Sequence, residues 1–199
     1  MRLNTVCSAI FAGILLFISS SVFAKIETAI FSAGCFWCAE DAFEKVPGVE
    51  KVLSGYTGGT VKNPTYQKVS AGGTGHYESI EVYFDSDKVS YSKLLDIFWR
   101  NVDPVDTEGQ FCDKGQQYKA AIFYNDAEQK KIALQSKENL KRGGRFKVIT
   151  TAILPASEFY PAEEYHQHYA QKNPTRYHYY RYRCGRDQRL EQLWGTPKP

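Results

Sequence analysis

Two cysteines and two large aromatic rings stand together in residues 34–40, where a strand pattern gives way to a helix pattern. Residues 26–32 alternate and are rich in β-branched and apolar side chains, and apolar residues then recur at helical spacing until Pro47 and Gly48. Cys35 is therefore predicted to lie at a helix N-terminus, where unpaired N–H groups and the helix dipole favour an anion. Its thiol is expected to ionise more readily than an ordinary cysteine and to act as a nucleophile. The alternative is that Cys35 is a small buried apolar side chain, as free cysteines often are.

The first 24 residues have the pattern of a secretory signal peptide. Arg2 supplies the positive end, an apolar stretch covers residues 9–18, and small residues lead to a cut near Ala24. The apolar stretch is too short to span a bilayer comfortably. The sequence therefore predicts a signal peptide at residues 1–24 and a single catalytic domain at residues 25–199, exported to the periplasm or secreted, with no membrane association after cleavage.

Four cysteines remain after Cys7 is removed with the signal peptide. Cys35 and Cys38 are three residues apart, a spacing that adds little loop-closure stabilisation and is typical of redox or metal chemistry. Cys112 and Cys184 are distant in sequence from this pair and from each other. An even number of cysteines in an exported protein is also consistent with two structural disulfides.

The charge of the chain does not indicate a nucleic-acid-binding protein. Without residues 1–24 the chain has 24 basic and 22 acidic side chains, which is close to balance. Residues 176–189 do interleave arginines with tyrosines, a combination that can bind single strands. Such a run more often stacks guanidinium groups on rings of its own domain, so nucleic acid is not an expected partner.

The elements that must position these residues follow from the periodicity of the remaining sequence. Strands are predicted over residues 26–32, 49–56, 80–84, 120–124 and 147–154, and helices over residues 39–46, 91–102, 126–142 and 162–171. Long loops fill residues 57–76 and 103–117, and such loops in compact domains are often functional. The order β-α-β-β-α-β predicts an α+β fold, a ferredoxin-like split β-α-β sheet with helices packed on one face, followed by an irregular C-terminal extension.

Several short blocks of the sequence resemble the peptide methionine sulfoxide reductases of type A. The blocks are residues 34–37, 55–59, 75–78, 103–104, 113–118 and 162–167, in the order of that family, across most of residues 28–178. The resemblance implies thiol-dependent reduction of methionine-S-sulfoxide, in peptides and proteins or free, to methionine, as a repair of oxidised proteins. It implies no metal and no organic prosthetic group. The expected partners are oxidised proteins or peptides and a thioredoxin-like protein or dithiol as reductant, and the expected state is a monomer.

The resemblance also implies a role for individual residues. Cys35 would attack the sulfoxide sulfur, and Phe36 and Trp37 would hold the S-methyl group, where a sulfur–aromatic contact contributes about 0.3–1.5 kcal/mol. Glu78 would be the acid that protonates the departing oxygen, provided that burial keeps its carboxyl neutral. Without the resemblance, the two rings would be read as core packing and Glu78 as a solvated charge at the start of a strand.

Three further residues match the family's site. Tyr56 and Tyr118 match two tyrosines that hydrogen-bond the sulfoxide oxygen, and Asp113 matches a residue that helps to order the pocket. The chain has 14 tyrosines, so composition alone would not select these two.

Attack would leave Cys35 as a sulfenic acid, which a second thiol must convert to a disulfide. This chain departs from the commonest family pattern here, because Cys38 stands where glycine is frequent and His178 stands where a resolving cysteine is frequent. Cys184, in the extension, is favoured narrowly over the nearby Cys38, and Cys112 is a third candidate.

Three other classes of protein fit parts of the pattern. A thioredoxin-type oxidoreductase also has Cys-x-x-Cys at a helix start, but the aromatic pair between the cysteines and the lack of a convincing cis-proline loop weaken this reading. A zinc module needs a second ligand pair, for which His166 and His168 are candidates, although a helical surface cluster is the simpler interpretation. A noncatalytic binding domain held by two disulfides is the third alternative.

Overall fold

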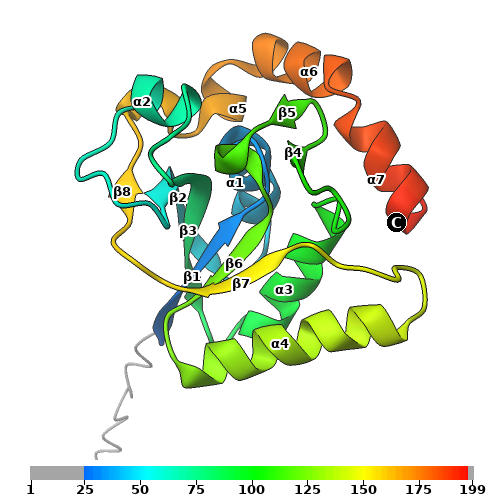
Figure 1. Ribbon diagram of the computed structural model, residues 1–199. Helices are drawn as coiled ribbons and strands as arrows, with labels where there is room; N and C mark the ends of the chain where they lie inside the picture. The colour runs from blue at the N-terminus through cyan, green and yellow to red at the C-terminus, as the bar shows by residue number, and fades with distance from the viewer. Residues whose placement is uncertain (1–24, 197–199) are drawn as a thin grey trace, which may run out of the picture.

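The computed structural model describes residues 25–196, and the predicted signal peptide lies outside them. A six-stranded sheet with the order β7-β6-β1-β3-β2-β8 forms the centre of the molecule (Figure 1). Its strands are β1 (Ile26–Ser32), β2 (Val49–Thr57), β3 (Tyr77–Asp85), β6 (Ala121–Tyr124), β7 (Ala152–Pro155) and β8 (Tyr160–Pro161). The helices are α1 (Phe36–Glu44), α2 (Tyr66–Ser70), α3 (Tyr91–Arg100), α4 (Ala127–Arg142), α5 (Tyr169–Lys172), α6 (Pro174–Arg183) and α7 (Arg186–Trp194).

The four central strands have the predicted ferredoxin-like arrangement. β1 pairs antiparallel with both β3 and β6, and β2 pairs antiparallel with β3, so β1 and β2 run in the same direction with β3 between them. The α+β class and the split β-α-β topology are therefore confirmed. β7 extends the sheet parallel to β6, and β8 extends it at the opposite edge.

The main core lies on one face of the sheet. Apolar side chains from α1, α3 and α4 meet alternate residues of the strands there; the largest are Phe31, Phe36, Phe43, Phe84 and Phe98. The Phe31 ring stacks on both Phe43 and Phe98, with centroid distances of 5.2 and 5.3 Å. Apolar side chains alternate along β1 and β3 in the sequence, because successive residues of a strand face opposite sides of the sheet.

Three segments differ from the sequence prediction. The loop over residues 57–76 contains the short helix α2, and the loop over residues 103–117 contains a hairpin of β4 (Gly109–Gln110) and β5 (Asp113–Lys114), followed by the 3₁₀ turn η1 (Gln116–Tyr118). β7 begins at Ala152 rather than at residue 147. The reason is that Thr150 donates its backbone and hydroxyl hydrogens to Pro104 and Asp106 carbonyls, so this part of the chain pairs with a loop and not with β6.

The C-terminal extension is helical, which corrects the prediction of an irregular tail. Residues 162–171, predicted as one helix, divide into the 3₁₀ turn η2 (Glu164–His166) and α5, because His168 adopts a left-handed conformation with φ 53°. α6 begins with Pro174 at its first position, and Gly185, with φ 67°, separates it from α7. These helices have few buried apolar residues, so the sequence showed no apolar period for them.

Polar contacts fix the two terminal helices to the domain instead. The Tyr177 hydroxyl donates to Asp41 on α1, and Arg189 pairs with Asp103 at 2.7 Å. A disulfide joins Cys184, at the end of α6, to Cys112 beside β5, across 72 residues of sequence. In the loop-closure model a bridge of this separation stabilises the fold by about 4 kcal/mol. No helix within the described residues is long and apolar enough to cross a membrane.

Candidate active site

Cys35 stands at the N-cap position of α1, as the sequence predicted. Gly34 makes the turn from β1 with φ 79°, and a Cβ at that position would lie 2.6 Å from Gln110 Cβ, so the close approach requires glycine. Cys35 is 6% exposed and Cys38, one turn further along, is 1% exposed. Both are free thiols.

At the start of α1 a backbone N–H donates its hydrogen bond to Glu78 and not to the Cys35 side chain. The Phe36 N–H donates to Glu78 Oε2 at 3.1 Å, whereas the Cys35 side chain accepts no capping hydrogen bond. Burial raises the pKa of the Cys35 thiol well above its usual value, and the neighbouring Cys38 and Glu78 act in the same direction. The structure therefore does not support a readily ionised Cys35, because burial disfavours its thiolate and the Phe36 N–H at the start of α1 is bound to Glu78.

The electron-rich sulfur of the pair is Cys38. The interaction with the Cys35 thiol lowers the pKa of Cys38, and the positive charges of Arg186 and Arg181 lower it further. Deprotonation of the pair therefore places the charge on Cys38. Transfer of one proton between the two sulfurs would move this charge to Cys35.

Glu78 lies in an environment that keeps its carboxyl protonated near neutral pH. It is 2% exposed, and burial raises its pKa to about 8 even though the Phe36 N–H hydrogen bond opposes that shift. The sequence reading of Glu78 as a solvated charge is thus excluded. A neutral carboxyl beside Cys35 can donate a proton to a leaving oxygen.

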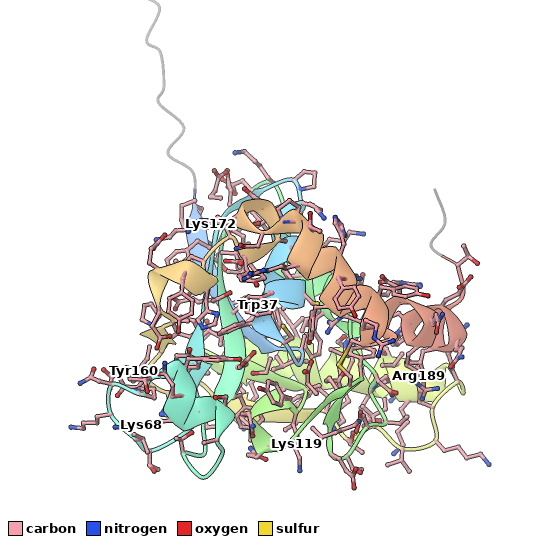
Figure 2. The ribbon with its side chains drawn as sticks, turned by 90° about the horizontal axis from the view of Figure 1, so that it is seen from above. Trp37, Lys68, Lys119, Tyr160, Lys172 and Arg189 are labelled. Atoms are coloured by element: carbon pink, nitrogen blue, oxygen red, sulfur yellow. A yellow bond between two sulfur atoms is a disulfide. The ribbon has the colours of Figure 1, made fainter. Side chains whose placement is uncertain are left out.

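The two aromatic residues after Cys35 have different environments. Phe36 is buried, with its ring centroid 5.9 Å from that of Tyr56 and 5.0 Å from that of His166. Trp37 is only partly buried; it stacks on Tyr169 at 3.7 Å and donates its indole N–H to His166 Nδ1 at 3.1 Å. Figure 2 shows Trp37 near the middle of the face that α5 and α6 border.

Tyr56 and Glu78 come from adjacent strands and lie directly opposite each other in the β2–β3 ladder. The Tyr56 hydroxyl donates to Glu163 at 2.9 Å, and burial is the largest cause of its raised pKa. Tyr118, in η1, is electrostatically coupled to Glu78, Asp113 and Cys35, all of which raise its pKa in addition to burial. The sheet and the hairpin loop therefore bring Tyr56, Tyr118 and Glu78 toward one region.

Asp113 lies at the edge of this region. Burial raises its pKa, and a hydrogen bond from the Tyr180 hydroxyl and the charges of Arg186 and Lys114 partly offset that effect. Tyr180 also meets the Trp37 ring edge-on at 5.8 Å. Tyr180 on α6 therefore contacts both Asp113 and Trp37.

The candidates for the resolving cysteine are separated by the structure into two groups. Cys184, which the sequence favoured, and Cys112 form the disulfide already described. Cys38 remains free and hydrogen-bonded to Cys35.

The histidines considered for zinc point in different directions. His166 is 2% exposed and faces Trp37, whereas His168 pairs with Glu44 near the surface. Glu40 accepts the His168 and Tyr169 N–H groups at 3.0 and 3.3 Å. Glu40, Glu44 and His168 therefore have partners within the protein, whereas His166 Nε2 is buried without a hydrogen-bond partner among the described residues.

The sequence did not identify Tyr180, Glu163 and His166 as site residues. Tyr180 belongs to a run of tyrosines that gives no indication of which one turns inward. Glu163 and His166 lie in residues 162–167, a block that carried the resemblance, but their contacts with Tyr56 and Trp37 depend on the position of η2. Only the resemblance could have drawn attention to this block.

Comparison with known proteins gives consistent results. The family model of peptide methionine sulfoxide reductase matches residues 27–198. A peptide methionine sulfoxide reductase MsrA from Bacillus licheniformis is 50% identical over 172 residues, which are 86% of this chain and 95% of the relative. Mxr1 from Saccharomyces cerevisiae in reduced form is 31% identical, with a TM-score of 0.72 over 76% of this chain and 87% of Mxr1. The structure of Mxr1 in complex with Trx2 is also similar, with a TM-score of 0.53 and 22% identity over 76% of this chain and 91% of that one.

The site and the comparisons agree on the chemistry. The free Cys35 lies at the start of α1, the buried Glu78 carboxyl with its raised pKa is bound to the next residue, and the Trp37 ring stacks on Tyr169. The chain belongs to the peptide methionine sulfoxide reductase family, and it is an oxidoreductase that reduces methionine-S-sulfoxide to methionine in protein repair, through a cysteine sulfenic acid and an intramolecular disulfide.

Proposed function

We propose that Cys35 is the nucleophile of this reaction, Glu78 its acid and Cys38 the cysteine that closes the disulfide. The observation that supports this most directly is the contact between Glu78 and the Phe36 N–H, which fixes a protonated carboxyl at the residue next to Cys35. Phe36 and Trp37 would receive the S-methyl group of the substrate.

The first step transfers one oxygen atom from the substrate to Cys35. Cys35 passes its proton to Cys38 and attacks the sulfoxide sulfur as a thiolate, which forms a bond between the two sulfurs. Glu78 protonates the sulfoxide oxygen, and this oxygen is then transferred to the Cys35 sulfur. The substrate S–O bond and the bond between the two sulfurs break, an S–O bond to Cys35 forms, and methionine leaves with Cys35 as a sulfenic acid. A neutral acid is required because oxygen leaves poorly as an unprotonated oxide.

Tyr118 and Tyr56 are proposed to stabilise the sulfoxide oxygen during this step, with Asp113 ordering the loop that carries Tyr118. Tyr118 supports this role through its electrostatic coupling to both Glu78 and Cys35. Tyr56 already donates its hydroxyl hydrogen to Glu163, so it would have to exchange that partner for the substrate oxygen.

Cys38 is proposed to resolve the sulfenic acid because it is the free thiol already in contact with Cys35. Cys184 and Cys112 would first have to be released from each other by reduction. The Cys35–Cys38 disulfide would then be reduced externally, and we propose a thioredoxin-like protein for this step. The complex of the similar yeast protein Mxr1 with Trx2 supports that class of reductant.

The Cys38→Ser variant tests this assignment. It is expected to produce one methionine per enzyme and then stop, with a sulfenic acid that a dione reagent can trap, when a thioredoxin-type protein is the reductant. The wild type should instead lose both free thiols after one turnover without reductant. Mass spectrometry of the oxidised enzymes measures both results.

The matched control is the double variant Cys112→Ser with Cys184→Ser. It should retain multiple turnover, provided that the Cys35–Cys38 pair is sufficient. A Cys38→Ser enzyme that turns over at the wild-type rate, together with an inactive Cys184→Ser enzyme, would contradict the assignment and favour Cys184.

We also propose that the enzyme acts outside the cytoplasm as a monomer, after removal of residues 1–24. The Cys112–Cys184 disulfide supports this location, because such bonds persist mainly in oxidising compartments. Expressed with its own leader in a Gram-negative host, the protein should be released by osmotic shock, begin at Lys25 and behave as a monomer in light scattering. An intact leader on a protein retained in the cytoplasm would disprove the export proposal.

A further inference from the structure

Arg186 is an arginine that is buried without an ionic partner. It is 1% exposed and is among the largest fully buried side chains of the described residues. Its Nη1 donates to the Ala33 carbonyl at 3.1 Å, and its Nη2 donates to the Asn101 carbonyl at 2.6 Å. Within residues 25–196 no carboxylate oxygen lies within 4.0 Å of this guanidinium, and its Nε has no hydrogen-bond partner.

Burying a charge of this kind costs free energy of folding, so an anion is expected nearby or the charge is expected to have a functional role. The neutral carbonyl groups satisfy only part of its hydrogen-bonding capacity. Two partly buried arginines of the same tail have carboxylate partners, since Arg181 pairs with Asp187 and Arg189 with Asp103. Arg186 therefore differs from its neighbours in that its charge faces the interior.

The location of Arg186 identifies the group that it serves. Its Nη1 contacts the residue before Gly34, and a Cβ on Gly34 would lie 3.7 Å from that nitrogen, so the guanidinium rests against the turn that leads into Cys35 and α1. The groups that act electrostatically on Cys38, the buried thiol of this turn, are Cys35, Arg186, Arg181 and Tyr177. The two arginines favour a thiolate at Cys38.

We propose that Arg186 is a positioning residue that supplies the positive charge for a Cys38 thiolate, and so accelerates the attack of Cys38 on the Cys35 sulfenic acid. This inference rests on the proposed role of Cys38 as the resolving cysteine. In the step, a Cys38–Cys35 S–S bond forms and the S–O bond of the sulfenic acid breaks. Cys38 is oxidised, the Cys35 sulfur is reduced, and the oxygen leaves as water after it takes a proton.

The Cys112–Cys184 disulfide connects two segments that lie next to Arg186. The Phe111 ring lies over the guanidinium at 4.4 Å, and Phe111 directly precedes Cys112. Cys184 precedes Arg186 by two residues, at the junction of α6 and α7. The bridge therefore ties the residue after the stacking ring to the C-terminal end of α6, two residues before Arg186. α6 and α7 lie next to β4 and β5, as this bridge requires (Figure 1).

The test compares Arg186→Gln with Arg186→Lys in the mature chain, in single turnover without reductant. Formation of methionine measures the first step, and loss of the two free thiols measures the second. For Arg186→Gln, disulfide formation is expected to slow by about tenfold or more, and by a larger factor than formation of the first methionine, for which Cys38 only accepts the Cys35 proton. Arg186→Lys keeps the charge and is expected to restore most of the second step.

A titration separates charge from packing. In a Cys35→Ser background Cys38 is the free thiol, and its thiolate absorbance should shift to a pH about one unit higher when Arg186 becomes Gln. Arg183→Gln, on the exposed side of α6, is the matched control and should change neither the titration nor the rates.

Three results would overturn the inference. One is a Gln variant with an unchanged titration and unchanged disulfide formation, and another is a Lys variant as slow as the Gln variant, which would indicate packing rather than charge. The third result applies if Arg186→Gln does not fold. It is an Arg186→Lys variant that folds but whose Cys38 titrates as an ordinary thiol. Failure of the proposed function would look different, because the wild type itself would then form no Cys35–Cys38 disulfide.

Discussion

The Cys35→Ser variant is expected to produce no methionine from methionine-S-sulfoxide, with a loss in rate on the order of 10⁴-fold or more. A serine hydroxyl is a far weaker nucleophile toward sulfur, and it cannot form the sulfenic acid that carries the oxygen away. The measurement is methionine released from a sulfoxide peptide in single turnover. The S epimer should be the substrate of the wild type.

Two comparisons make this result specific. Cys38→Ser should still release one methionine, more slowly because it lacks the thiolate that accepts the Cys35 proton, and Cys35→Ser should release none. The fold should be intact, because the Cys35 backbone carbonyl accepts the first hydrogen bonds of α1 and its side chain makes no capping hydrogen bond. Release of methionine by Cys35→Ser at a rate near that of the wild type would remove Cys35 from the reaction.

The Glu78→Gln variant is expected to slow the first step by about 10²- to 10⁴-fold with a much smaller effect on substrate binding. Glutamine has the same shape and can still accept the Phe36 N–H hydrogen bond, but it has no proton to give. Single-turnover rates measured over a range of substrate concentrations separate the chemical step from binding. Unchanged chemistry in this variant would exclude Glu78 as the acid.

The pH profile gives an independent check on Glu78. Burial raises its pKa to about 8, and the protonated form is the one that can act as acid. The rate of the first step should therefore be high below that pH and fall as the pH rises through it, and the variant should lack this decline. Glu81→Gln is the control, since Glu81 lies on the same strand but faces the other side of the sheet.

Much of the fold was predictable from local patterns. The alternation in β1 and β3 and the helical periodicity of α3 and α4 are features of residues close in sequence, and each predicted the element that the structure contains. The terminal helices were not predictable in this way. They are attached through Tyr177, Arg186 and Arg189, which are polar residues without a periodic apolar face.

The sequence by itself determined the position of Cys35 at the start of a helix and the aromatic residues beside it, because these depend on neighbours in the chain. Which of the two thiols carries the negative charge was decided by the tertiary structure alone. Whether Cys35 or Cys38 is the thiolate depends on Glu78 from β3 and Arg186 from α7, which meet α1 only after the chain has folded. The pairing of Cys112 with Cys184 was decided in the same way, since a disulfide needs proximity in space and sequence spacing does not reveal it.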